Sequence, residues 1–508
     1  MLDRGGKVFK QSAPVIKLPE EATEEDHLRL LGLLNSSTAC FWMKQVFHGK
    51  GQGGVGQESR AEWEEFIEHD GTKLQQFPIP ATTPLERPQT LDTLAQELSA
   101  TLPAAVVDAA PPTRERLQAA REQVRSLRAR MVALQEELDW ECYHHYGLLE
   151  HPMALPTDAL PELHRGERAF EIALARDMAA GKVRSTWFER HGSTPVTELP
   201  AHWPDRYREA VEARIALIRS DRKIRLLERP EYKRRWNWDD WDTLEQDALR
   251  TWLLDRLEAL PCWQEPELQT VGRLADHLRT DAEAMEAARL YVGRLDVDLP
   301  DLVGTLVKDE TVPFAAPYRF KASGMRKRRA WERTWELQRL EDEVEARTAL
   351  PPEDPQHLSP AQAEALRKEH KLDRIPVPPK YVKGDFRSGA AYSLRGKLDV
   401  PKERFIGYPD TRIGADGTAV VGWAGWDHLM RARALAGHLQ RRKDEGADAR
   451  ELTPLLVGLA ELVPWLQQWH NEMDPVWGER MGDFFRAYVD TETQALGLTR
   501  DDLHRWTP

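Results

Sequence analysis

The strongest constraint on the fold of this chain is a run of apolar residues with helical spacing near position 130. Intervals of three and four residues connect Leu117, Ala120, Val124, Leu127, Met131, Leu134 and Leu138. This spacing places the side chains along one side of an α-helix over several heptads. Arginine and glutamate fill most of the outer positions. We therefore expect a helix over residues 114–141, about 40 Å long at about 1.5 Å per residue, with Gly147 as its C-terminal stop.

The bulk composition predicts several folded domains with a strongly hydrated surface. The chain has 508 residues, of which 41% are hydrophobic and 31% charged, and this length exceeds what one hydrophobic core supports. The net charge of -13 argues against nucleic-acid binding over the whole surface, because phosphate contacts need basic side chains. Local basic patches can still act, since salt screens exposed charges beyond about 8–10 Å.

The cysteines and the hydropathy pattern argue against secreted and membrane proteins. Cys40, Cys142 and Cys262 lack the spacing of metal ligands and form no even disulfide set. No stretch approaches the roughly 18 consecutive apolar residues of a membrane span, and the N-terminus has no apolar signal region. We expect a cytoplasmic protein without membrane contact, because a reducing compartment fits this cysteine usage.

The remaining periodicity predicts a mainly α fold with small α+β parts. Helices are expected over residues 26–34, 91–98, 166–180, 204–227, 239–260, 271–294, 325–347, 427–443, 452–469 and 481–495. The apolar run 38–47 fits either a helix or a strand. Short strands are expected over residues 7–17, 397–408 and 419–423, the last two in a region enriched in Gly, Val and aromatic residues.

Several motifs, in a fixed order, resemble one family of enzymes. They are Leu33-Leu34-Asn35-Ser36 with Phe41-Trp42, Phe77-Pro78-Ile79-Pro80, the stretch Met131–Trp140 followed by Tyr143–Leu148, and the stretches Trp187–Pro195, Glu228–Trp236 and Gly422–Trp426. Together they resemble the C-terminal, target-recognition portion of the PglX family, the adenine-specific DNA methyltransferases of phage-growth-limitation (BREX type 2) systems. The resemblance covers nearly the whole chain.

The sequence pattern and the resemblance together divide the chain into five segments. Residues 1–80 would be the end of a target-recognition module, and residues 81–150 a linker with a long spacer helix. Residues 151–350 would form a helical domain and residues 351–380 a proline-rich hinge. Residues 381–508 would form a mixed, then helical, C-terminal domain.

The resemblance also implies a reaction that this chain lacks the motifs to perform. Such enzymes transfer a methyl group from S-adenosylmethionine to the N6 atom of an adenine that has left the base stack. The chain contains neither the glycine-rich donor motif nor the Asn/Asp-Pro-Pro-Tyr/Phe tetrad. We therefore assign no catalytic, cofactor-binding or metal-binding residue and expect no activity from this chain alone. The expected partners are double-stranded DNA, a methyltransferase domain in cis or in trans, and other phage-defence proteins.

Candidate DNA contacts come from the first motif, the glycine-rich loop Gly49–Gly56 and two basic segments. Phosphate contacts require such basic side chains, and interleaved aromatic residues can stack on a splayed base. The alternative is a purely structural role, in which the first motif supports the fold and the basic segments are solvated helix faces. The candidates are Asn35, Ser36, Lys44, Lys50, Lys321, Arg326, Lys327, Arg328, Arg329, Lys380, Lys383, Arg387, Arg395 and Lys397.

Other motifs favour structural roles. The loop Gly49–Gly56 lacks the Gly-Lys-Ser/Thr ending of a phosphate-binding loop. His144 and His145 are adjacent and diverge on a helix, so they do not form a metal site. Trp236, Trp238 and Trp241 are expected to pack on a neighbouring helix, with a partner-docking patch as the alternative. A helical protein-interaction module without DNA reading, and an enzyme with an unrecognised site, remain the alternative functions.

Overall fold

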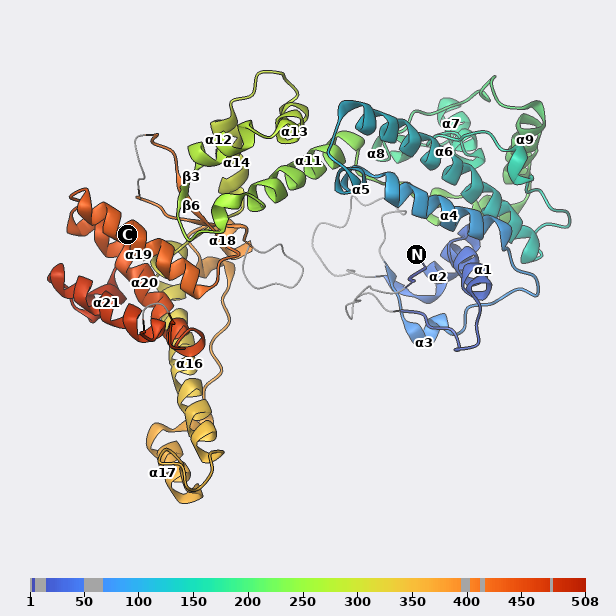
Figure 1. Cartoon of the computed structure of the whole chain (residues 1–508). Helices are drawn as coiled ribbons and strands as arrows, with labels where there is room; N and C mark the ends of the chain where they lie inside the picture. Colours follow the sequence, from blue (N-terminus) through green and yellow to red (C-terminus); the bar gives the residue numbers. More distant parts are fainter. Residues whose placement is uncertain (1, 5–14, 50–66, 394–402, 412–415, 476–477) are drawn as a thin grey trace. The chain divides into compact units, whose positions relative to one another are not determined.

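The computed structural model describes residues 2–4, 15–49, 67–393, 403–411, 416–475 and 478–508. The chain divides into two compact units, Met1–Leu249 and Arg250–Pro508. Helices dominate both units, with small sheets in each, which confirms the mainly α expectation (Figure 1). The expected strand over 7–17 and the loop Gly49–Gly56 lie largely outside the described residues. The finer division into five segments stays a prediction.

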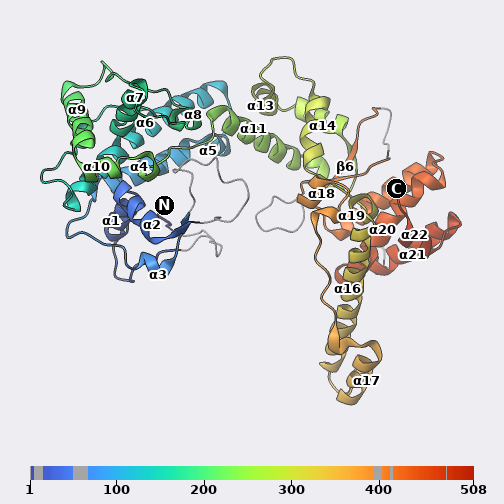
Figure 2. The same ribbon diagram turned by 180° about the vertical axis from the view of Figure 1, so that it is seen from behind.

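The first unit is organised around one long helix, α6 (Arg114–His145). All the heptad residues from Leu117 to Leu138 are buried, so the expected long helix is confirmed. Its end is a Schellman motif: Gly147, at φ 66°, donates to the His144 carbonyl, and Leu148 donates to the Tyr143 carbonyl. Helix α4 (Glu86–Thr101) packs along α6 (Figures 1 and 2), and α5 (Pro103–Ala109) connects the two.

Two short helices precede this pair in the first unit. Helices α1 (Glu24–Leu34) and α2 (Ser37–Val46) are separated by Asn35 and Ser36, and Ser36 is the N-cap of α2. The ambiguous run 38–47 is therefore helical as far as Val46, and Phe47 is extended. Strands β1 (His48–Gly49) and β2 (Ile67–Glu68) then form a short antiparallel pair, followed by α3 (Gly71–Leu74).

The remaining helices of the first unit are α7 (Ala169–Ala179), α8 (Trp187–Arg190), α9 (Asp205–Ser220) and α10 (Arg222–Leu227). The expectation of one helix over 204–227 is wrong, because the chain breaks at Asp221. The Asp221 carboxylate accepts hydrogen bonds from the amides of Lys223 and Ile224 and begins α10. The expected helix over 271–294 in the second unit is broken for the same reason at Asp281.

A four-stranded sheet lies in the core of the second unit. Strands β3 (Gln269–Thr270), β6 (Val420–Trp423), β5 (Phe405–Gly407) and β4 (Thr311–Pro313) are adjacent in this order. The β4–β5 pair is parallel and the others are antiparallel. The strands expected near 397–408 and 419–423 are thus confirmed where the structure describes them. Around the sheet pack α12 (Val271–Arg279), α13 (Ala282–Val292), α14 (Leu299–Asp309), α19 (His428–Asp444) and α20 (Ala449–Trp469).

A helical hairpin extends from this unit. Helix α16 (Ala322–Thr348) packs at its C-terminal half against α17 (Pro360–His370), as both ribbon views show (Figures 1 and 2). Leu337, Val344, Leu358 and Ala363 form the core of the hairpin. The other helices are α11 (Trp241–Glu258), in which the division between the units falls, α15 (Ala316–Arg319), α18 (Gly389–Ser393), α21 (Met481–Ala495) and α22 (Arg500–Arg505).

None of the described helices combines the length and apolar character that crossing a bilayer requires.

Candidate nucleic-acid interface

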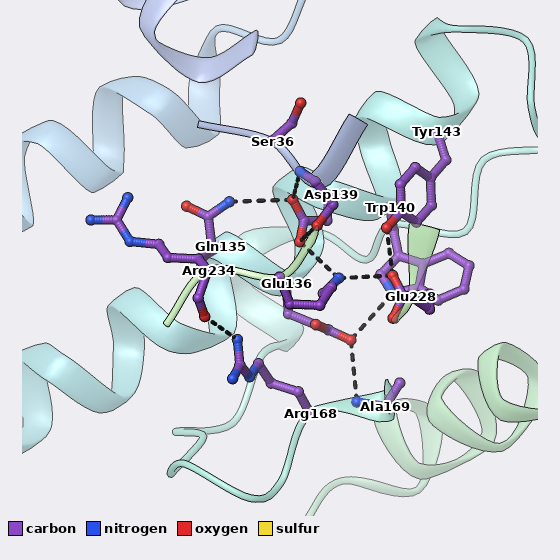
Figure 3. Close-up of polar contacts among 12 residues, drawn as sticks. Ser36, Gln135, Glu136, Asp139, Trp140, Tyr143, Arg168, Ala169, Glu228 and Arg234 are labelled. Carbon is purple, nitrogen blue, oxygen red and sulfur yellow. Dashed lines mark hydrogen bonds and ion pairs between the residues drawn. The ribbon is translucent and has the colours of Figure 1, made fainter. Parts of the chain in front are cut away.

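A buried polar network in the first unit joins three of the sequence motifs (Figure 3). Asp139 of α6 accepts hydrogen bonds from the Ser37 amide at 2.8 Å and the Ser37 hydroxyl at 2.6 Å. The Lys233 ammonium lies 2.8 Å from carboxylate oxygens of both Asp139 and Glu228. Tyr143 donates to the same Glu228 oxygen. Because these side chains are buried, the network holds α2 and the segment after α10 against α6 and offers no access to a substrate.

The two candidate contacts of the first motif are used within this arrangement. The Ser36 hydroxyl is buried; it donates to the Leu33 carbonyl at 2.7 Å and accepts from the Ala39 amide. The Asn35 side chain donates to the Leu31 carbonyl, and its backbone carbonyl accepts from Gln135 at 3.1 Å. These contacts favour the structural interpretation of Asn35 and Ser36.

Glu136 of α6 is a buried carboxyl beside this network (Figure 3). One of its oxygens accepts from the Trp140 indole at 3.2 Å and the Ala169 amide at 3.3 Å (Figure 3), while the other is buried without a hydrogen-bond partner. Burial raises the pKa of Glu136 to about 7, although the nearby Lys233 charge opposes the shift. The neutral carboxylic acid is therefore the stable form in slightly acidic solution.

This pKa predicts a pH dependence of stability. Between the unfolded pKa of about 4.3 and the folded pKa of about 7, the folded state binds more protons, so the free energy of unfolding falls as the pH rises. The expected loss is about 3 kcal/mol over this window. Glu136→Gln should remove most of it. Urea unfolding from pH 5 to pH 8 tests this, with the exposed Glu189→Gln as control. An unchanged pH slope in Glu136→Gln contradicts the assignment.

In the second unit, the two basic segments of the sequence meet around the first turns of α16. The Lys321 amide donates to the Asp385 carbonyl, and the Arg387 amide donates to the Arg319 carbonyl, both at 2.8 Å. Between them, Phe320 and Phe386 form an antiparallel bridge. Six exposed basic side chains are thereby gathered into what we call the α16 basic cluster: Lys321, Arg326, Arg329, Lys380, Lys383 and Arg387.

Other predicted contacts are engaged within the unit. Lys327 donates to Asp385 at 2.6 Å and lowers the pKa of that carboxyl to about 2. Arg328 is 8% exposed and donates to Glu332 at 2.7 Å, so neither side chain is free to pair with a phosphate. In the first unit, half-buried Lys44 in the last turn of α2 has a partner within the chain. Lys50, Arg395 and Lys397 lie outside the described residues.

The aromatic residues interleaved with the basic segments are also used in packing. The rings of Trp331 and Trp335 each lie 5.6 Å from Trp465 of α20. The Tyr381 ring stacks on Phe320 at 4.9 Å. These contacts favour the structural interpretation of the aromatic residues over base stacking.

The described residues do not fit a methyl-donor site. A donor site of the expected class needs a glycine-rich turn between a parallel strand and a helix. The described strands are two to four residues long and contain one parallel pair, β4–β5. Nor do described His, Cys, Asp and Glu side chains gather in threes as metal ligands do. We derive no reaction step through S-adenosylmethionine or a metal from these residues.

The fold and this site define a class: a helical, two-unit protein with a local basic cluster on an acidic chain. The chain belongs to the family described as "Domain of unknown function (DUF7008)", whose model matches residues 131–508. It is 46% identical over 520 residues to the adenine-specific methyltransferase PglX of Streptomyces coelicolor, which confirms the resemblance found in the motifs. That match covers 100% of this chain and 41% of the relative. No solved structure matches the chain.

Proposed function

We propose that this chain is the DNA-binding and scaffold portion of an adenine-specific DNA methyltransferase acting in phage defence. The 46% identity to a protein of that activity over the whole chain supports the proposal most. The S-adenosylmethionine site and the catalytic residues would lie in a separate methyltransferase domain, in cis or in trans. Double-stranded DNA, that domain and other phage-defence proteins would be the partners.

The charge arrangement in the second unit supports DNA contact through the α16 basic cluster. Lys321, Arg326, Arg329 and Lys383 are exposed, and no carboxylate among the described residues forms an ion pair with them. These basic side chains repel one another, which destabilises the folded unit slightly. The phosphates of a nucleic-acid backbone would remove this repulsion. The contacts would fix the position of the duplex rather than read its sequence.

The salt dependence of DNA binding tests this role. We expect replacement of Lys321, Arg326, Arg329 and Lys383 by glutamine to weaken binding of a duplex of arbitrary sequence. The slope of log K against log salt should flatten by about 0.9 for each phosphate that the variant no longer neutralises. Fluorescence anisotropy over a range of salt concentrations measures both quantities with the full chain.

A matched control separates a local role from overall charge. Replacing the exposed Arg279, Arg294, Lys308 and Arg450 by glutamine removes the same formal charge from other elements of the same unit. The control should retain the wild-type slope. If the slope of log K against log salt flattens equally in both variants, or if the wild-type chain binds no duplex at low salt, the proposed DNA contact at α16 is wrong.

A groove in the second unit favours a second candidate, a protein-interaction module. The groove has a volume of about 350 Å³, and its lining residues include Trp331, Trp335, Trp465, Arg329 and Arg486. Tryptophan and arginine dominate the energetics of protein interfaces. A chain that binds no DNA but co-purifies stoichiometrically with the methyltransferase domain, and loses it on Trp335→Ala, would support this candidate.

A further inference from the structure

One concave site in the first unit has no role in the proposed function. It is a pocket of about 770 Å³ between one flank of α6, the segment before α7 and the turn after α8. This volume falls in the range of small-molecule sites, about 300–1,000 Å³. Its walls combine apolar side chains, among them Val124, Val132 and Leu163, with a concentration of arginine. Such a pocket fits a ligand with one apolar and one anionic part.

Two guanidinium groups in this pocket share one indole. Arg128 lies 4.5 Å and Arg165 5.3 Å from the ring centroid of Trp238. Among the residues the structure describes, no carboxylate forms an ion pair with either arginine. Burial and then the charge of Arg165 lower the pKa of Arg128, with Asp239 opposing the shift. The pair therefore carries a positive potential that the protein itself leaves largely uncompensated.

Two polar atoms of the same pocket lack hydrogen-bond partners. The Nε atom of Arg128 and the hydroxyl of Ser193 are both buried and unpaired. Buried polar groups are paired in the great majority of cases, so each unpaired group needs an explanation. A hydroxyl and a guanidinium N–H are both donors that an anionic oxygen accepts from. Together with the arginine pair, they add two uncommitted hydrogen-bond donors to the wall of this pocket.

We propose that this pocket binds a phosphate-bearing ligand of nucleotide size. Arg128, Arg165 and Ser193 would contact the phosphate, and the apolar wall would contact the base. Two acids line the pocket: Glu167 already accepts a hydrogen bond from the His164 amide, and Glu122 is exposed. The ligand would be either a free nucleotide or the 5′-phosphorylated terminal nucleotide of a DNA strand, since both present a phosphate monoester next to a base. The site lies in the first unit and is independent of the α16 basic cluster.

The sequence contains a row of arginines at this site, next to the apolar heptad positions of α6. Arg121, Arg125 and Arg128 recur at intervals of four and three residues, so they form a basic stripe beside the apolar seam of α6. All three line the pocket. Sequence alone presents this stripe as an ordinary solvated face, because Arg165 and Ser193 approach it only in the folded unit.

Isothermal titration calorimetry with the full chain tests the proposal. The probes are inorganic phosphate, adenosine, AMP, ATP and a single-stranded octanucleotide with and without a 5′-phosphate. We expect AMP, ATP or the phosphorylated strand to bind at least about tenfold more tightly than its unphosphorylated counterpart. AMP binding points to a free nucleotide as the source, and binding of the phosphorylated strand alone points to DNA.

The variants locate the site. Arg128→Gln/Arg165→Gln should weaken phosphorylated probes by at least about tenfold, while Arg130→Gln, an exposed arginine of α6 outside the pocket, should leave them unchanged. Arg165→Gln alone serves if the double variant fails to fold. Without ligand, Arg128→Gln should melt no lower than wild type, because it relieves like-charge repulsion. Absence of binding by every probe at millimolar concentration, no preference of AMP, ATP or the phosphorylated strand over the counterpart without that phosphate, or unchanged binding by the arginine variants would each overturn the proposal.

Discussion

Replacing Lys233 by methionine should lower the free energy of unfolding of the first unit by about 3–5 kcal/mol. The Lys233 ammonium is fully buried and lies 2.8 Å from both Asp139 and Glu228. Burial alone would lower the pKa of Lys233, but the charges of Asp139 and Glu228 overcome this effect and raise it. Methionine fills a similar volume but leaves two buried carboxylates without a cation, and uncompensated buried charge is among the most destabilising changes.

The deficit of Lys233→Met should depend on pH. Without the ammonium, Glu136 loses the charge that opposes the rise of its pKa, so its neutral form should be favoured further, acid should restore stability, and the deficit should shrink from pH 8 to pH 5. Adding Glu228→Gln to Lys233→Met should recover part of the loss. Hydrogen exchange of the α6 amides reports the first unit separately. The exposed Lys223→Met should change stability by less than about 0.5 kcal/mol. A deficit that stays constant with pH would mean that lost packing, not charge, explains it.

The local sequence pattern predicted the helices and strands of this protein better than it predicted the contacts between them. The heptad seam of α6 and the Gly147 stop depend on residues a few positions apart, which the sequence presents directly. Ser37 and Asp139 are 102 residues apart, and no periodicity relates them. The motifs were recognisable as a group only through the family resemblance. The structure now gives a physical reason for their association, since Ser37, Asp139 and Lys233 meet in one buried network.

The basic segments illustrate the same limit at the candidate interface. Sequence presented residues 326–329 as four equivalent cations. In the structure, Lys327 pairs with Asp385, 58 residues away, and Arg328 is buried beside Glu332. Arg326 and Arg329 remain exposed. Charge density along a sequence therefore overstates the charge available to a ligand, because folding supplies acidic partners from distant segments.

The second large effect is expected at the ion pair between Arg214 of α9 and Glu137 of α6. The Arg214 guanidinium donates to both Glu137 oxygens, at 2.8 and 2.6 Å, and both side chains are 0% exposed. Burial alone would lower the pKa of Arg214, but Glu137 overcomes the effect and raises it. Arg214→Met should therefore destabilise the first unit by about 3–5 kcal/mol, because it leaves the Glu137 carboxylate buried without a cation.

The Arg176–Glu212 pair provides a control with the same geometry and different burial. Arg176 of α7 donates to both Glu212 oxygens at 3.0 and 2.7 Å, but the Glu212 side chain is 50% exposed. Because water screens this pair, Arg176→Met should cost at most about 1 kcal/mol. Urea unfolding, with hydrogen exchange of the α6 amides as the readout, compares Arg214→Met with Arg176→Met. The double variant Glu137→Leu/Arg214→Met should be more stable than Arg214→Met, since it removes the orphaned charge, although the Leu155 amide loses its carboxylate partner. Equal losses at the two arginines would show that bidentate geometry, rather than burial, determines the strength of these pairs.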